Sequence, residues 1–222
     1  MIKVKMFVLI GMILFGLQNT MCFAFDNGDF QYHGMIQANH KISDKWKANV
    51  TEELYWGDNS RDFYYHHTDI GFAYSGLADW FNLSLNYRRI YSESNGKWKV
   101  ENRPHINGTV KWKVSGFGLS NRARLEYRDQ EALSASWRFR NMVTVVSPLK
   151  LTRFEIAPFI ADDIFYDLGQ GKFSSNEFWA GINFQIAKDV SGGIYYILPS
   201  MRVTDSEWKN YNVLTTNISV NI

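Results

Sequence analysis

The sequence contains little cysteine, little proline and no excess of basic charge. Its single cysteine is Cys22, and only four prolines occur in 222 residues. Beyond position 22 the chain therefore has neither a disulfide framework nor a thiol nucleophile. Few prolines and no low-complexity stretch leave no linker that would divide the chain into domains. The 24 basic and 22 acidic residues give no sign of a nucleic-acid partner.

The N-terminus has the pattern of an export signal. Lys3 and Lys5 precede an apolar run over 6–17, and Cys22 and Ala24 supply small side chains at the positions that a signal peptidase reads. The apolar run is shorter than the roughly 20 residues that a membrane-spanning helix needs. We therefore predict a cleaved signal peptide over 1–24 and a single domain over 25–222. Without the two leader lysines, this domain has 22 basic and 22 acidic residues.

Alternation of apolar and polar residues is the dominant pattern of the remaining chain. In 177–186, for example, Phe178, Ala180 and Ile182 alternate with Glu177 and Asn183. A period of two sends alternate side chains to opposite faces of a strand. Eleven segments have this pattern: 30–42, 46–56, 62–74, 80–91, 98–114, 118–128, 136–146, 154–166, 177–186, 190–202 and 212–222.

Three features of these segments favour a membrane. Most are about 10 to 13 residues long, near the ~9–11 residues of a tilted transmembrane strand. Short turns, such as 43–45 and 115–117, alternate with longer polar stretches, such as 91–97 and 167–175, as in outer-membrane barrels. Tryptophans fall near segment ends, where rings meet the membrane interfaces; they are Trp46, Trp56, Trp80, Trp98, Trp112 and Trp137.

The fold class that follows is all-β: a single antiparallel transmembrane β-barrel with a polar, ionic lumen. Single-chain bacterial barrels have an even number of strands, so we expect one of the eleven segments to be miscounted. The prediction is accordingly roughly 10–12 strands. A soluble periplasmic barrel or sandwich that binds a ligand is the alternative.

Several phrases also resemble a known family. They are YYHHTDIGFAYSGLADWFNLSLNYRRI (64–90), WKVENRPHINGTVKW (98–112), NRARLEYRD (121–129), WRFRN (137–141), ADDIFYD (161–167) and YNVLTTNISV (211–220). Together they resemble the bacterial family called domain of unknown function 2490, whose members look like small outer-membrane β-barrels. The resemblance covers nearly the whole chain after the signal peptide, and it implies a barrel without supplying a catalytic residue.

The face predicted to point inward is strongly charged. Its candidate residues are Arg88, Glu101, Arg103, Arg122, Arg124, Glu126, Arg128, Arg138 and Arg140. An arginine facing lipid near the midplane would cost roughly 2–4 kcal/mol, which places these residues in the lumen. We expect Arg88 opposite Glu101 and Glu126 opposite Arg138. The charges either pair across a closed lumen or, through an arginine surplus on 118–128 and 136–146, form a constriction for a small anionic solute.

Metal and enzyme sites have weaker support. His66 and His67 are adjacent and point to opposite faces, so only His67 and Asp69 could share a metal, and two ligands make a poor site. We predict no metal and no cofactor. The stretch YSESNGKW (91–98) has a serine, Ser94, but no imidazole to act as its base, and Ser-Asn-Gly is turn chemistry.

The sequence thus predicts a non-enzymatic outer-membrane barrel that is a structural or surface component. Its partners would be outer-membrane lipid and, during biogenesis, the barrel-assembly machinery. A narrow anion-preferring channel is the first alternative, a soluble periplasmic ligand-binding barrel the second, and a lipid hydrolase the least favoured.

Overall fold

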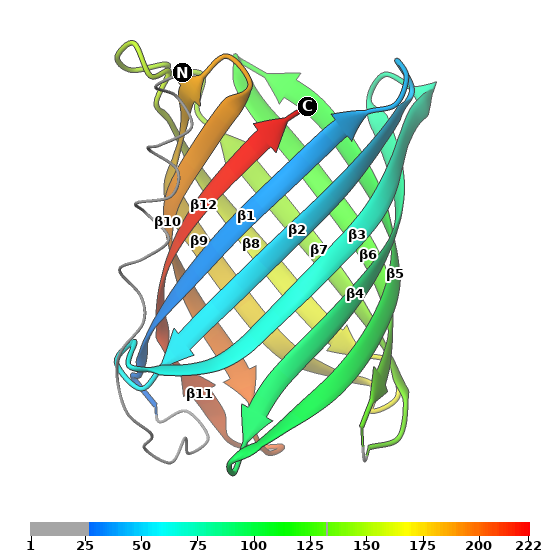
Figure 1. Cartoon of the computed structure of the whole chain (residues 1–222), viewed down its shortest axis with the longest axis vertical. Coiled ribbons are helices and arrows are strands. Elements are labelled where there is room, and N and C mark those ends of the chain that lie inside the picture. Colours follow the sequence, from blue (N-terminus) through cyan, green and yellow to red (C-terminus); the bar gives the residue numbers. More distant parts are fainter. Residues whose placement is uncertain (1–26, 132) are drawn as a thin grey trace, which may run out of the picture.

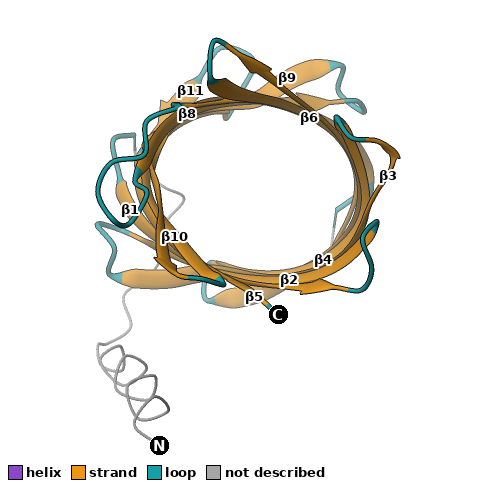
Figure 2. Cartoon of the chain, turned by 90° about the horizontal axis from the view of Figure 1, so that it is seen from above, coloured by secondary structure: helices purple, strands orange, loops and turns teal. Residues whose placement is uncertain are grey.

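The computed structural model describes residues 27–131 and 133–222, and the predicted signal peptide 1–24 lies outside this part of the chain. The described residues form one sheet that closes on itself as a barrel (Figures 1 and 2). Its strands are β1 (Phe30–Lys41), β2 (Trp46–Gly57), β3 (Asp62–Ala78), β4 (Phe81–Ser94), β5 (Lys97–Val114), β6 (Phe117–Gln130), β7 (Ser136–Val146), β8 (Ala157–Asp167), β9 (Lys172–Ala187), β10 (Val190–Arg202), β11 (Trp208–Asn210) and β12 (Asn212–Asn221). No helix within the described ranges has the length and apolarity to cross a membrane.

The barrel wall has eleven strands. Strands β1 to β10 pair in sequence order, and each pair is antiparallel. The short β11 and the longer β12 pair with successive parts of β10 and are separated only by Tyr211, so they form one interrupted strand. The all-β barrel is confirmed, and the eleven alternating segments correspond to its eleven strands.

The expectation of an even strand number was wrong, because the barrel closes through one parallel pair. β12 runs parallel to β1, from Phe30 opposite Asn212 to Asn39 opposite Asn221. An odd number of strands that otherwise alternate in direction can close only in this way. As a result β1 begins at the lower end of the barrel in Figure 1, whereas β12 ends at the upper end.

The expected asymmetry between short turns and long loops is also wrong. The connections at the lower end of Figure 1 are 58–61, 95–96, 131–135, 168–171 and 203–207, and those at the upper end are 42–45, 79–80, 115–116, 147–156 and 188–189. The longest therefore lies at the end expected to have only short turns. At the lower end, Asn95 and Gly96 adopt positive φ values of 56° and 74°, which suit a two-residue hairpin turn, so β4 and β5 continue through most of 91–97.

The interior of the barrel differs between its two sides. On the side of β8 to β12 it contains an apolar cluster: Tyr195, Ile197 and Val213 are buried, and Phe159 and Trp179 pack against them. On the side of β3 to β8 it is filled by charged side chains, which form the candidate site. Apolar packing thus occupies only part of the space that the sheet encloses.

Gly181 marks a close approach of β9 and β10 beside this apolar cluster. A Cβ atom at position 181 would lie 2.4 Å from the carbonyl oxygen of Ile194 and 2.6 Å from the Cα of Tyr195, both backbone atoms of β10. Backbone cannot rotate away as a side chain can. The alternating pattern requires a residue facing inward here, and the packing requires that it be glycine.

We predict that Gly181→Ala lowers the free energy of unfolding by about 1–3 kcal/mol, the usual cost of overpacking. Denaturant unfolding of the purified barrel, followed by tryptophan fluorescence, measures the change. Gly108→Ala is the matched control, since its Cβ would meet only the Phe81 ring, at 3.4 Å. Equal midpoints for the two variants would contradict the close approach.

Candidate functional site

The nine charged residues predicted for the lumen come from four neighbouring strands. Arg88 lies on β4, Glu101 and Arg103 on β5, Arg122, Arg124, Glu126 and Arg128 on β6, and Arg138 and Arg140 on β7. All nine are buried or half-buried, although they lie on a sheet whose other face is exposed. The cluster is built on strands whose apolar residues point outward, as the alternation requires.

Glu126 is the centre of the cluster. It is fully buried, and its carboxylate accepts hydrogen bonds from three arginines. Arg138 donates from Nε at 2.8 Å and from Nη2 at 2.5 Å, Arg124 donates from Nη1 at 3.3 Å, and Arg140 donates from Nη1 at 3.5 Å. Glu126 lies directly opposite Arg138 in the pairing of β6 with β7. One carboxylate therefore compensates the charge of three guanidinium groups in part.

A second carboxylate, Asp163 on β8, extends the cluster. It is fully buried and accepts hydrogen bonds from Arg140 Nη2 at 2.6 Å and from Arg122 Nη2 at 3.1 Å. Because Arg140 contacts both Glu126 and Asp163, it joins the two carboxylates. The Arg140 guanidinium also lies 3.9 Å from the centre of the Phe165 ring. The Arg140 guanidinium thus interacts with two carboxylates and one aromatic ring.

Glu101 forms the third centre, with partners other than the one expected. Arg103 Nε donates to it at 2.6 Å, and Arg128 donates from Nε at 3.0 Å and from Nη2 at 3.1 Å. The expected pairing of Glu101 with Arg88 is wrong. The two-residue turn after β4 sets the register so that Arg88 lies opposite Arg103.

Arg88 finds its partner on the other neighbouring strand. Its Nε donates to Asp69 Oδ2 on β3 at 2.8 Å, and the amide of Asn86 donates to the other oxygen of Asp69 at 2.8 Å. His105 Nε2 lies 3.6 Å from Asp69 as well. Neither Asp69 nor Asp163 was among the predicted lumen residues. Their position in the alternation of 62–74 and 154–166 is the signal that could have identified them.

The two adjacent histidines point to opposite faces, as strand geometry requires. His67 is fully buried in the lumen, with Nε2 at 3.6 Å from Glu53, whereas His66 lies on the outer face, with Nδ1 at 3.3 Å from Glu52. Within residues 27–131 and 133–222 no three His, Cys, Asp or Glu side chains are grouped so as to hold a metal ion. The lumen chemistry of the described residues is that of ion pairs.

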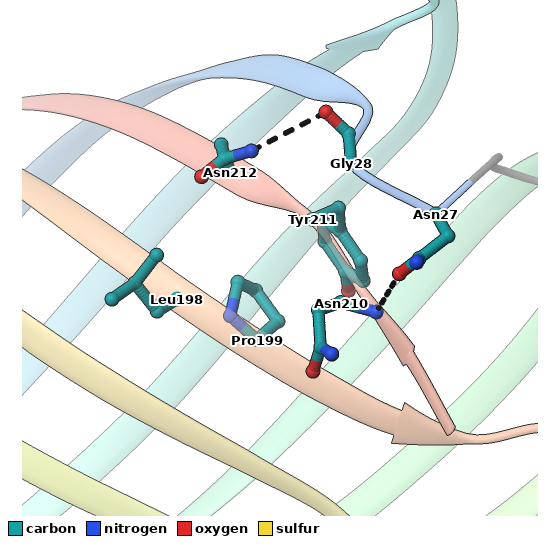
Figure 3. A pocket seen from close by; sticks show the side chains of 7 residues that line it. All are labelled: Asn27, Gly28, Leu198, Pro199, Asn210, Tyr211 and Asn212. Carbon is teal, nitrogen blue, oxygen red and sulfur yellow. Dashed lines mark hydrogen bonds between the residues drawn. The ribbon is translucent and has the colours of Figure 1, made fainter. Parts of the chain in front are cut away.

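A cavity of about 440 Å³ lies away from the charged cluster, at the interruption between β11 and β12 (Figure 3). The residues that line it are Asn27, Gly28, Leu198, Pro199, Asn210, Tyr211 and Asn212. Asn27 accepts a hydrogen bond from the backbone N–H of Asn210 at 2.9 Å, and Asn212 donates to the carbonyl of Gly28 at 3.3 Å. Because the lining has no charged or nucleophilic side chain, we do not take it as the functional site.

The architecture and the charged cluster can now be compared with known proteins. The family described as "Protein of unknown function (DUF2490)" matches residues 30–210, most of the barrel. The chain belongs to this family. The resemblance seen in the sequence is thereby confirmed, and it extends from the start of β1 to the end of β11.

The chain was also compared with curated proteins and with solved structures. No curated protein matches the chain. Among solved structures, the chain is similar to LpxR from Salmonella typhimurium at 8% identity, with a TM-score of 0.44, over 79% of this chain and 83% of that one. At this level the likeness bears on neither activity nor location.

Proposed function

We propose that this protein is a non-enzymatic, integral outer-membrane β-barrel whose lumen is closed by its own ion pairs, and that it acts as a structural or surface component. The observation that supports the membrane most strongly is the outer wall. Large apolar side chains are exposed on all sides of the barrel; examples are Ile36, Val50, Ile70, Phe72, Leu85, Ile106, Val143, Ile160, Phe178, Ile194, Leu198 and Ile218. Soluble monomers rarely expose apolar patches larger than a few hundred Å².

Aromatic residues at both rims of this wall agree with the proposal. Trp46 and Trp112 lie near the upper ends of their strands, and Trp98 and Trp137 near the lower ends. All four are exposed. Amphipathic rings at the ends of transmembrane strands are typical of the girdles at the two membrane interfaces.

The closed lumen is supported by its ion pairs, since each of the seven lumen arginines has a carboxylate within 4.0 Å. The arginine surplus of β6 and β7 is met by Glu126 on β6 and by two carboxylates from other strands, Glu101 and Asp163. Glu126 and Asp163 have no exposed surface, which argues against a water-filled path beside them. A selective anion pore would instead need guanidinium groups that are free to meet the ion.

The membrane location and the choice between the alternatives go further than the fold. Delivery to the outer membrane depends on the predicted signal peptide and on recognition by the barrel-assembly machinery. A soluble periplasmic barrel would have to keep its apolar outer wall in water. In the least favoured alternative, the lipid hydrolase, the candidate Ser94 is the last residue of β4, and only Asn95 and Gly96 form the turn that follows.

A single charge on the outer wall tests the membrane location. Leu85 is 65% exposed between Phe72 and Ile106, which are also exposed. In lipid vesicles we expect Leu85→Arg to lower the free energy of unfolding by about 2–4 kcal/mol, the cost of arginine on a lipid-facing strand. Guanidinium titration of the folded barrel in vesicles measures it.

Leu149→Arg, in the exposed connection 147–156, is the matched control and is expected to change stability by less than about 0.5 kcal/mol. Water around the whole barrel would make Leu85→Arg equally harmless. In that case the membrane proposal would have to be given up in favour of the soluble barrel.

A further inference from the structure

A row of polar residues crosses the outer wall from β2 to β6 and interrupts its apolar surface. In the pairing of these strands Glu52 lies opposite Thr68, Thr68 opposite Arg89, Arg89 opposite Asn102, and Asn102 opposite Asp129. At roughly 4.8 Å between strands, the row is about 19 Å long. We call these five residues the polar row.

The polar row faces outward. Its members alternate along their strands with residues that are buried inside the barrel, among them Asp69, Ile90 and Glu101. On one side the row borders exposed apolar residues such as Val50 and Ile70. The row therefore lies at the margin of the apolar wall and belongs to a surface that the lumen chemistry does not use.

Arg89 distinguishes the polar row from an ordinary solvated surface. The other arginines within strands each have a carboxylate within 4.0 Å; they are Arg88, Arg103, Arg122, Arg124, Arg128, Arg138, Arg140 and Arg202. Arg89 has none among the described residues, and it contacts the Tyr91 ring at 5.5 Å. It is exposed on the outer face while its neighbour Arg88 is paired inside.

A second donor lies beside Arg89. The hydroxyl of Tyr87 donates to Asn102 Oδ1 at 2.6 Å, so the amide oxygen is occupied and the NH2 group is the remaining polar group of this side chain. The row has two acids: Glu52 already accepts a hydrogen bond from Thr68 at 2.5 Å and interacts with His66 at 3.3 Å, and Asp129 lies beyond Asn102, two strands away from Arg89. The free hydrogen-bonding capacity next to Arg89 is thus that of donors, which suits an anion.

The aromatic residues around the row indicate its depth in the membrane. His66 stacks on Tyr91, with ring centres 4.8 Å apart, and lies 5.9 Å from Phe63 and 5.8 Å from Trp98. These rings belong to the lower aromatic rim of the barrel, where lipid headgroups lie. An arginine at that level can reach a phosphate while the chains of the lipid cover Val50 and Ile70.

From this arrangement we infer that the polar row is a binding site for the phosphate-bearing headgroup of a membrane lipid, with Arg89 and Asn102 as its anion donors. The inference rests on the proposed membrane location. It assigns a ligand class to the outer wall, which the ion-paired lumen does not require.

Binding of phosphatidylglycerol to the purified barrel in a neutral detergent tests the site, with native mass spectrometry as the readout. We expect the wild type to retain phosphatidylglycerol in preference to a diacylglycerol with the same chains. Arg89→Gln should weaken this binding about tenfold or more, because a hydrogen bond to a charged group has an effect of that order.

Arg153→Gln is the matched control. Arg153 is also exposed and lies over a ring, 4.8 Å from the centre of Phe154, but in the connection at the other end of the barrel. It should bind phosphatidylglycerol as the wild type does. Equal binding by wild type and Arg89→Gln, or equal loss in both variants, would overturn the site.

Two additional measurements separate the sources of failure. Displacement of phosphatidylglycerol by inorganic phosphate at the same concentration would show a site for a soluble anion, and the lipid assignment would be wrong. Extraction of wild-type protein from membranes by carbonate would refute the membrane location itself. Protein that resists carbonate yet binds lipid without dependence on Arg89 would refute only the polar row.

Discussion

Glu126→Gln is expected to lower the free energy of unfolding by about 3–5 kcal/mol, the usual cost of removing one partner from a buried ionic group. The amide keeps the size of the side chain but removes the charge that Arg124, Arg138 and Arg140 share. Only Arg140 has a second carboxylate, Asp163, so Arg124 and Arg138 are left without a close counter-charge. Guanidinium unfolding of the barrel in vesicles measures the loss.

Glu155→Gln is the control for this substitution. Glu155 pairs with Lys150 at 2.5 Å, as close as the shortest contact of Glu126, but both side chains are more than half exposed. An exposed ion pair contributes at most about 1 kcal/mol. If Glu126→Gln and Glu155→Gln have the same small effect, the lumen is hydrated around Glu126 and is not closed by its ion pairs.

The second large effect concerns conduction. Wild-type protein in a planar lipid bilayer is expected to show no unitary conductance, because the guanidinium groups of β6 and β7 are bound to buried carboxylates. The recording is made on protein whose folding is verified independently, so that silence reports on the barrel. An open pore would show discrete conductance steps, whereas the closed barrel is expected to show none.

The double variant Arg124→Ala/Arg140→Ala decides the alternative. Both arginines lie among the buried residues of the lumen. If the wild type conducts with a preference for anions, and the preference falls in the double variant, the protein is a narrow anion channel and the closed-lumen proposal is wrong. A silent wild type would direct attention to the outer wall and the connections.

The contrast between these residues shows how far sequence reasoning reaches. Alternation along β6 is local, so the inward direction of Arg122, Arg124 and Arg128 follows from their spacing alone. The partner of each is not local. Arg88 was expected opposite Glu101, but the two-residue turn at Asn95 and Gly96 places Arg103 opposite it.

The same limit explains the missed carboxylates. The alternation along their own strands predicts that Asp69 and Asp163 face inward. Their role as ion-pair partners depends on Arg88, Arg122 and Arg140, which lie on other strands. No spacing within one segment reports such a contact. The polar row was hidden for a related reason, since its five residues come from five strands and become neighbours only through the register.

By itself, the sequence determined the class of fold, the approximate positions of the wall strands and the face on which each side chain lies, because a strand imposes a period of two on its own residues. Only the tertiary structure decided the parallel closure of β1 with β12, the partners of each arginine and the isolation of Arg89. Those features depend on register and closure, which bring together residues that are distant along the chain. Closing eleven strands into a ring requires one parallel pair of strands, and local alternation does not reveal which pair that is.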